Sequence, residues 1–318
     1  MEDNETNTSE TMSPFEKAYS TNHGCRLCPR ACNAKRGEGT RGYCGAGREL
    51  RLARAALHHW EEPCISGTRG SGAVFFSGCP LGCCFCQNYK ISHEGFGLEI
   101  TEDRLAEIFL SLQEQGAHNI NLVTATPYTD AVLRVLDRLR GKSLMIPIVW
   151  NSSGYERLET LKRLSGYIDI YLPDFKYADA ARAKRYSYAE DYPETALSAI
   201  LEMQRQTGKY VLGEDGILRR GTVVRHLVMP GGRRDSIQVM EELAAHFERD
   251  DILVSLMSQY TPCYKSCDYP ELNRRVTTFE YESVCDVLTA YGFEGYYQEK
   301  SSAKEEYTPP FDLEGVIK

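Results

Sequence analysis

The chain has 318 residues, of which 26% are charged and 42% hydrophobic, and its formal net charge is -8 at neutral pH. This length permits one sizeable α/β domain with a small appendage, and the composition is that of an ordinary globular protein. The negative charge argues against a general nucleic-acid-binding role, and the lack of any run of about 18 apolar residues argues against a membrane span.

Residues 1–20 are rich in Glu, Asn, Thr and Ser and show no hydrophobic periodicity, which predicts a disordered tail. The start also lacks the apolar segment of a secretion signal, so we expect the protein to stay in the cytoplasm. The chain contains twelve cysteines. In a reducing compartment, closely spaced cysteines indicate metal binding more often than disulfides.

A cysteine-rich segment follows the tail, and residues 21–70 are predicted to form a small N-terminal module. Its first cysteines, at positions Cys25, Cys28, Cys32 and Cys44, have the spacing C-x2-C-x3-C-x11-C. Four such thiols suit tetrahedral zinc or a fully ligated iron–sulfur cluster, and the third alternative is a set of reduced thiols without metal. The spacing favours a metal and leaves its identity open.

The most specific pattern, SGAVFFSGCPLGCCFCQNYK, occupies residues 71–90. Its apolar start predicts a buried strand, and Cys79, Cys83 and Cys86 follow with the spacing C-x3-C-x2-C on a glycine-rich loop. Three thiolates at this spacing can hold one face of a [4Fe-4S] cluster and leave the fourth iron without a protein ligand. Cys84, inside the loop, is predicted to be a packing residue.

From residue 71 to about residue 300, short apolar strands alternate with amphipathic helices, as is typical of parallel α/β units. Strands are predicted at 73–76, 119–124, 146–150, 168–172, 222–228 and 252–257. Helices are predicted at 102–115 with Thr101 as N-cap, 129–139, 156–164, a long region ending near 208, 236–247 and 279–292. Six units are too few for a closed eight-stranded barrel, so we predict a partial, open (β/α)6 TIM-like barrel over 71–300, with a doubly wound sheet as the alternative. Residues 301–318 are predicted to be a C-terminal tail.

Polar residues follow the predicted strands and define a candidate site. Because the carboxyl ends of parallel strands meet at one rim, we expect Asn151, Asp174 and Lys176 to converge there. A lysine in this position can pair with a ligand carboxylate. For His226, residue type alone favours a core histidine with its hydrogen bonds satisfied. Arg225 faces the opposite way and is predicted either to point outward or to bind the tail of a ligand.

The cysteine spacing resembles the signature of the radical S-adenosylmethionine (radical SAM) enzymes. The NSSGYE, DFK and VVRHLVMPG segments resemble those of pyruvate formate-lyase activating enzymes, most closely the PflX-like branch, and the resemblance covers about residues 24–298. It implies a radical SAM barrel in which Cys79, Cys83 and Cys86 bind a [4Fe-4S] cluster whose open iron chelates SAM. It also implies that the following side chains contact SAM, the first near the adenine: Phe85, Asn151, Ser153, Asp174, Lys176 and His226.

By the same resemblance the protein is a radical SAM oxidoreductase that receives an electron from a donor such as flavodoxin or ferredoxin. SAM cleavage then yields a 5′-deoxyadenosyl radical that removes hydrogen from a substrate, either a glycine in a partner protein or a small molecule. One segment departs from the family, since Thr124-Ala125-Thr126-Pro127 stands where the activating enzymes have Gly-Gly-Glu to hold the methionine amine. The alternatives are an iron–sulfur electron-transfer protein and a zinc-binding module, both without turnover.

Overall fold

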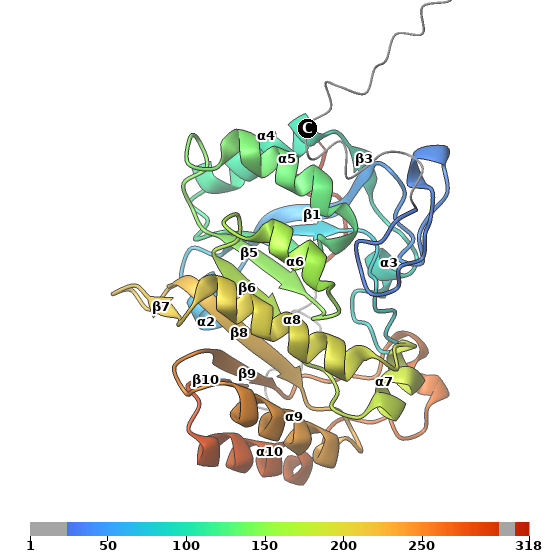
Figure 1. Ribbon diagram of the computed structural model, residues 1–318, viewed down its shortest axis with the longest axis vertical. Helices are drawn as coiled ribbons and strands as arrows, with labels where there is room; N and C mark the ends of the chain where they lie inside the picture. The colour runs from blue at the N-terminus through green and yellow to red at the C-terminus, as the bar shows by residue number, and fades with distance from the viewer. Residues whose placement is uncertain (1–23, 299–308, 318) are drawn as a thin grey trace, which may run out of the picture.

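The computed structural model describes residues 24–298 and 309–317. In this part of the chain ten strands form one sheet, in the order β10-β9-β8-β6-β5-β4-β2-β1-β3, with β7 (Val211–Leu212) paired to β8. The predicted tail at 1–20 lies outside the described residues, as do residues 301–308 and 318 of the predicted C-terminal tail. Figure 1 shows the long helices packed along one face of this sheet.

The six predicted parallel strands are present, each with its carboxyl end toward the same rim. They are β2 (Ser71–Phe76), β4 (Ile120–Val123), β5 (Ile148–Ser152), β6 (Ile170–Pro173), β8 (Leu218–Leu227) and β9 (Leu253–Met257). A short further strand, β10 (Gly295–Tyr297), adds to β9 in parallel. With the long helices on the outer face only, the fold is a partial TIM-like α/β barrel and not the doubly wound alternative.

The helices lie close to the predicted ranges, because their apolar faces repeat with helical periodicity. They are α4 (Glu102–Glu114), α5 (Thr129–Leu139), α6 (Leu158–Leu164), α9 (Arg233–His246) and α10 (Thr278–Tyr291). Thr101 is the N-cap of α4, as predicted, and its hydroxyl accepts a hydrogen bond from the Arg104 backbone N–H at 3.1 Å. The long helical region consists of α7 (Ala180–Ser187) and α8 (Tyr192–Thr207), because Tyr188 adopts a left-handed conformation that ends α7.

The N-terminal segment joins the sheet through β1 (Leu50–His58), a strand that the sequence analysis did not predict. β1 pairs antiparallel with β2 and with β3 (Leu98–Ile100). Residues 309–317 lie beside β1, where the Ala55 N–H donates to the Glu314 carbonyl at 2.8 Å. The remaining elements are short: η2 (Arg36–Glu38), α2 (Pro63–Ser66), α3 (Tyr89–Ser92), η3 (Thr126–Tyr128) and η4 (Tyr264–Asp268).

The inner face of the sheet is apolar at one end and polar at the other. Val149, Leu172 and Val223 belong to a small buried cluster on this face, together with Ile65 of α2. Two positions further along each strand, on the same face, the residues are polar. The apolar cluster therefore closes one end of the barrel and leaves a polar cavity at the carboxyl ends of the strands. No helix of the described residues is long and apolar enough to cross a membrane.

Candidate active site

The three cysteines of the C-x3-C-x2-C loop open into one cavity. Cys79, Cys83 and Cys86 line a cavity of about 240 Å³ at the carboxyl ends of the parallel strands, here called the strand-end cavity. The Ser92 hydroxyl donates to Cys86 Sγ at 3.2 Å, and the Ser187 hydroxyl donates to Cys83 Sγ at 3.1 Å. Burial raises the pKa of all three thiols, that of Cys86 to about 11, so the thiols are protonated at neutral pH.

The cysteine loop is held against the N-terminal segment. Gly78 has a φ of 97°, and a Cβ at this position would lie 2.6 Å from the Cys44 carbonyl oxygen, so only glycine permits this approach. The Arg30 guanidinium donates to the Pro80 carbonyl at 2.9 Å and to the Leu81 carbonyl at 2.7 Å. The N-terminal segment thus fixes the conformation of the loop that carries the three thiols.

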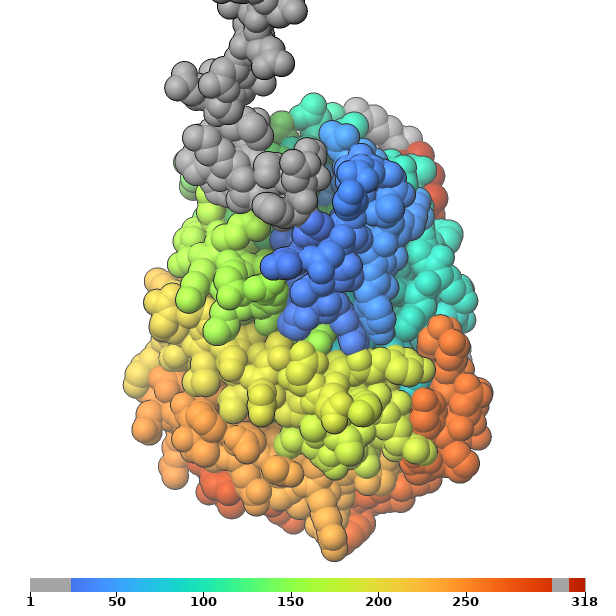
Figure 2. Space-filling view, turned by 45° about the vertical axis from the view of Figure 1, so that its right-hand side comes forward, coloured from blue at the N-terminus to red at the C-terminus, as the bar shows by residue number. Residues whose placement is uncertain are grey.

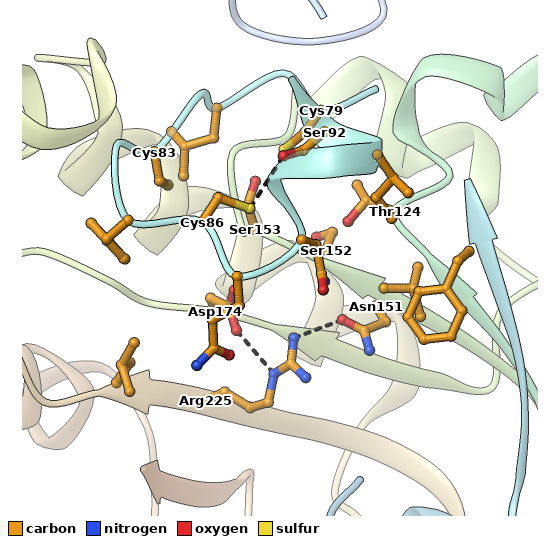
Figure 3. Close-up of a pocket in the computed structure, with 18 of the residues that line it drawn as sticks. Cys79, Cys83, Cys86, Ser92, Thr124, Asn151, Ser152, Ser153, Asp174 and Arg225 are labelled. Atoms are coloured by element: carbon orange, nitrogen blue, oxygen red, sulfur yellow. Dashed lines mark hydrogen bonds and ion pairs between the residues drawn. The ribbon is translucent and has the colours of Figure 1, made fainter. Parts of the chain in front are cut away.

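Opposite the cysteines lies a group of buried, mostly charged side chains centred on Arg225, and Figure 3 shows part of it. The Arg225 guanidinium donates to Asp174 at 2.9 Å, to Asn151 at 2.7 Å and to Glu61 at 3.3 Å. Of the two alternatives for Arg225, the outward orientation is wrong, because this side chain lines the cavity on the inner face of β8, two positions beyond Val223. We call Glu61, Asn151, Asp174, Lys176 and Arg225 the polar floor.

Lys176 completes the polar floor. Its ammonium group lies 2.6 Å from Asp174 Oδ2. Burial tends to raise the pKa of Asp174, but the Arg225 and Lys176 cations hold it below its usual value. The Tyr192 hydroxyl, from α8, accepts from the Lys176 backbone N–H and lies 2.9 Å from the carbonyls of both Ser153 and Asp174. Tyr192 was not predicted as a site residue, and it ties the loops after β5 and β6 together.

Glu61 is a cavity residue that the sequence analysis did not identify. It lies between β1 and α2 and accepts hydrogen bonds from Asn121 at 3.2 Å and from Asn151 at 3.3 Å. Burial raises its pKa, and the attraction of Arg225 opposes this shift. No motif marks Glu61. It comes from a segment distant in sequence from the other cavity residues, and only the unpredicted strand β1 brings it to the site.

Ser153 and Phe85, whose contacts with SAM are predicted from the resemblance, line the strand-end cavity. The Ser153 hydroxyl is buried and has no hydrogen-bond partner among the described residues. Phe85 packs against the Tyr260 ring, with 6.0 Å between ring centroids. A buried hydroxyl without a partner at a cavity wall is suited to a ligand that supplies the missing hydrogen bond.

His226 lies outside the residues that line the cavity. Its Nδ1 is 2.6 Å from the Phe175 carbonyl and its Nε2 is 2.8 Å from the Ser236 hydroxyl of α9. Burial lowers the pKa of His226 to about 4, so the ring is neutral. This is the satisfied core histidine that residue type favours. The predicted SAM contact of His226 remains a prediction that this placement does not support.

The amino-acid sequence is similar to that of a known protein family. The profile of the Radical SAM superfamily matches residues 73–244, more than half of the chain. A curated relative, the uncharacterized protein MJ0674 of Methanocaldococcus jannaschii, is 29% identical over 280 residues, which cover 86% of this chain and 76% of the relative.

Solved structures also share the fold. A radical SAM methyltransferase from Sphaerobacter thermophilus has a TM-score of 0.50 and 17% identity, covering 72% of this chain and 66% of that chain. A domain of a pyruvate-formate lyase-activating enzyme from Bacteroides vulgatus has a TM-score of 0.38 and 15% identity, covering 54% of this chain and 92% of that domain. At these identities, the likeness to the methyltransferase is a likeness of fold alone.

Proposed function

Because the chain belongs to the radical SAM superfamily, whose members use a [4Fe-4S] cluster and SAM, we propose that the strand-end cavity is the site of both cofactors. The observation that carries this proposal is that Cys79, Cys83 and Cys86 share one cavity with the polar floor. They are the only cysteines that line it among the described residues. Three thiols bind three irons of such a cluster, and the fourth iron is left for SAM.

The chemistry of the cavity wall matches the groups of SAM. The Lys176 ammonium suits the methionine carboxylate, and the Glu61 carboxylate suits the methionine ammonium. The amide of Asn151 and the unpartnered hydroxyl of Ser153 suit the ribose hydroxyls. The Phe85 ring offers an apolar surface for the adenine. Each assignment pairs a side chain at the cavity wall with one group of the ligand.

Glu61 can also replace the glutamate of the Gly-Gly-Glu segment, which this sequence lacks. Thr124 stands in the segment where the activating enzymes carry Gly-Gly-Glu, and a threonine provides no charge for the methionine amine. Thr124 and Glu61 line the same cavity. We assign to Glu61 the role of the missing glutamate, supplied from the segment between β1 and α2. Asp174 holds Lys176 in place and is a positioning residue.

When bound, the reduced cluster and SAM supply a 5′-deoxyadenosyl radical that removes a hydrogen atom from a substrate. The chain's own part is to hold the ligands, orient them on the polar floor and exclude water beneath the cysteine loop. The electron comes from a low-potential one-electron donor of the flavodoxin or ferredoxin class.

For the substrate we favour a glycine in a partner protein. Exposed aromatic side chains surround the site, and aromatic residues are enriched at protein interfaces. Trp60 lines the strand-end cavity and is 54% exposed, while Tyr43 and Tyr188, which line a second cavity beside the cysteine loop, are 50% and 55% exposed. These rings support a macromolecular partner at the cavity.

The test is anaerobic reconstitution with iron and sulfide, reduction with dithionite, and chromatography for 5′-deoxyadenosine and methionine after SAM is added. We expect product from the wild type and from Cys285→Ala, a matched cysteine variant on α10, and none from Cys83→Ala. Equal traces from wild type and Cys83→Ala would overturn the proposal. Bound iron without product would favour the electron-transfer alternative, and zinc without iron would favour the zinc module.

A further inference from the structure

The four N-terminal cysteines come together in the fold, outside the strand-end cavity. Backbone hydrogen bonds between Cys25 and Ala34 and between Asn33 and Cys25, both 3.0 Å long, close the loop that carries the first three cysteines. The loop that carries the fourth cysteine is closed by the Gly42 N–H, which donates to the Ala46 carbonyl at 3.0 Å. The two closed loops bring the thiols of Cys25, Cys28, Cys32 and Cys44 near enough to interact electrostatically, Cys25 with Cys32 and Cys44, and Cys28 with Cys25 and Cys44.

Glycine at position 42 keeps the space between two of these thiols free. A Cβ at Gly42 would lie 3.4 Å from Cys32 Sγ and 3.4 Å from Cys44 Sγ. Any larger side chain would therefore fill the space that these thiols face. Arg36 Nη2, 3.2 Å from the same Cβ position, also borders this space.

A cation contacts these thiols. Arg36 Nη2 donates to Cys44 Sγ at 3.3 Å, Nη1 donates to the Pro127 carbonyl, and Nε is buried without a partner. Within residues 24–298 and 309–317, Arg36 forms no ion pair with a carboxylate. A partly buried guanidinium is stabilised by a compensating anion, and thiolates of these cysteines can carry that charge.

Zinc is redox-inactive, whereas an iron–sulfur cluster carries electrons. The contact of the N-terminal segment with the loop that carries Cys79, Cys83 and Cys86 therefore favours a cluster over zinc at the four N-terminal thiols.

We propose that Cys25, Cys28, Cys32 and Cys44 hold a second iron–sulfur cluster and that Arg36 offsets its negative charge. Four thiolates complete the coordination of such a cluster and leave no iron open to SAM. This site is therefore chemically distinct from the strand-end cavity, and the proposal does not rest on SAM cleavage or on any substrate.

The location of the second site indicates its use. Arg30, between two of the four cysteines, donates to the Pro80 and Leu81 carbonyls of the other cysteine loop and to the carbonyl of Ser187, the last residue of α7. Figure 2 shows the blue N-terminal segment packed against the yellow-green region that contains α7. Cys44 and Cys79 line one shared cavity of about 270 Å³. A second cluster that a low-potential donor protein has reduced can thus pass one electron to the cluster at Cys79, Cys83 and Cys86. No bond is made or broken in this transfer.

The test is iron, sulfide and zinc analysis of the anaerobically reconstituted full chain, with EPR and Mössbauer spectra. We expect Cys32→Ala to lose about two irons if the second cluster is [2Fe-2S] or about four if it is [4Fe-4S]. Cys83→Ala should lose about four irons, and the double variant should lose all of them. Cys32 and Cys267 are both exposed, so Cys267→Ala is the matched control and should keep the full iron content.

Two results would overturn the proposal: wild-type iron content in Cys32→Ala, or about one zinc per chain that disappears with this substitution. Thermal melts of both cysteine variants check folding, and the exposure of Cys32 makes unfolding an unexpected outcome. Arg36→Gln should keep its iron and lower the reduction potential of the second cluster only, with recovery in Arg36→Lys. An unchanged potential would overturn the role given to Arg36. Loss of 5′-deoxyadenosine formation with both clusters present would contradict the proposed function and leave this inference standing.

Discussion

Replacing Ser153 by alanine is expected to weaken SAM binding without lowering the free energy of unfolding. In the ligand-free protein the Ser153 hydroxyl is buried without a hydrogen-bond partner. A buried hydroxyl in this state costs about 1–3 kcal/mol, so its removal should leave the free energy of unfolding unchanged or raise it. When SAM is bound, the same hydroxyl contributes one hydrogen bond worth about 1 kcal/mol. The dissociation constant for SAM should therefore rise about fivefold in Ser153→Ala.

Ser236→Ala provides the matched control, since it removes the same atom from a position outside the cavity. The Ser236 hydroxyl lies 2.8 Å from His226 Nε2, and its loss leaves a buried ring nitrogen without a partner. Ser236→Ala should lower the free energy of unfolding by about 1–3 kcal/mol and leave SAM affinity unchanged. Calorimetric titration of the reconstituted protein and urea unfolding of the ligand-free protein measure the two quantities. A Ser153→Ala variant with lower stability and unchanged affinity would refute the reasoning.

Three further substitutions test buried positions of the barrel by urea unfolding, and two of them have a matched control. Arg225→Met leaves the buried Glu61 carboxylate without its cation, while Asp174 keeps Lys176. It should cost about 3–5 kcal/mol, whereas Arg220→Met, on the exposed part of the same strand, should cost far less; similar losses would contradict the polar floor. Burial raises the pKa of Glu156 from 4.5 to about 7. The folded state thus keeps a proton that the unfolded chain releases, and wild-type stability should fall by about 3 kcal/mol between pH 4.5 and pH 7. Glu156→Gln should remove this fall, and an unchanged pH profile would argue against it. Gly154→Ala, where a Cβ would lie 2.2 Å from a carbonyl oxygen at the end of β6, should cost more than about 3 kcal/mol. Gly166→Ala, with a similar positive φ and open space, should cost about 1–2 kcal/mol, and equal costs would show that the contact at Gly154 is unimportant.

The sequence alone predicts those helices and strands whose apolar residues form one clear buried face or one short buried run. Residues 129–139 were predicted as a helix, and α5 has these bounds. Its apolar side chains repeat with helical periodicity and are buried against the sheet. The parallel strands were equally clear, since each is a short apolar run followed by polar residues. The local sequence of such an element is enough to predict it, because its own apolar residues show which surface is buried.

The same property of the strands explains the error at Arg225. Both faces of a parallel barrel strand are buried, so alternation of residue type does not show which face lines the cavity. Val224 and His226 of β8 lie on one face, and Val223 and Arg225 lie on the other. Only the packing of Val224 with the apolar side chains of α9 shows which face is the outer one. Val223 belongs to the apolar cluster of the inner face, and Arg225, two positions later, therefore points into the cavity.

Glu61 shows a second limit, because its position depends on strand pairing. β1 carries no regular alternation that marks it as a strand, and it pairs antiparallel with β2 across a bulge between Leu52 and Arg54. This pairing ends at His58 opposite Ser71, which leaves Glu61 at the inner face of the barrel. Antiparallel pairing between distant segments has no local sequence signal of its own.

The register that closes the barrel is also the register that builds the site. Val149, Leu172 and Val223 belong to the apolar cluster on the inner face, and the residues two positions beyond them are Asn151, Asp174 and Arg225. A slip of one residue in any of these strands would therefore expose apolar surface and turn a site residue toward the helices at the same time. Apolar packing at one end of the barrel thus provides the precision that the polar floor needs at the other. This coupling explains how the buried, charged polar floor can be held in place by segments that share no local sequence motif.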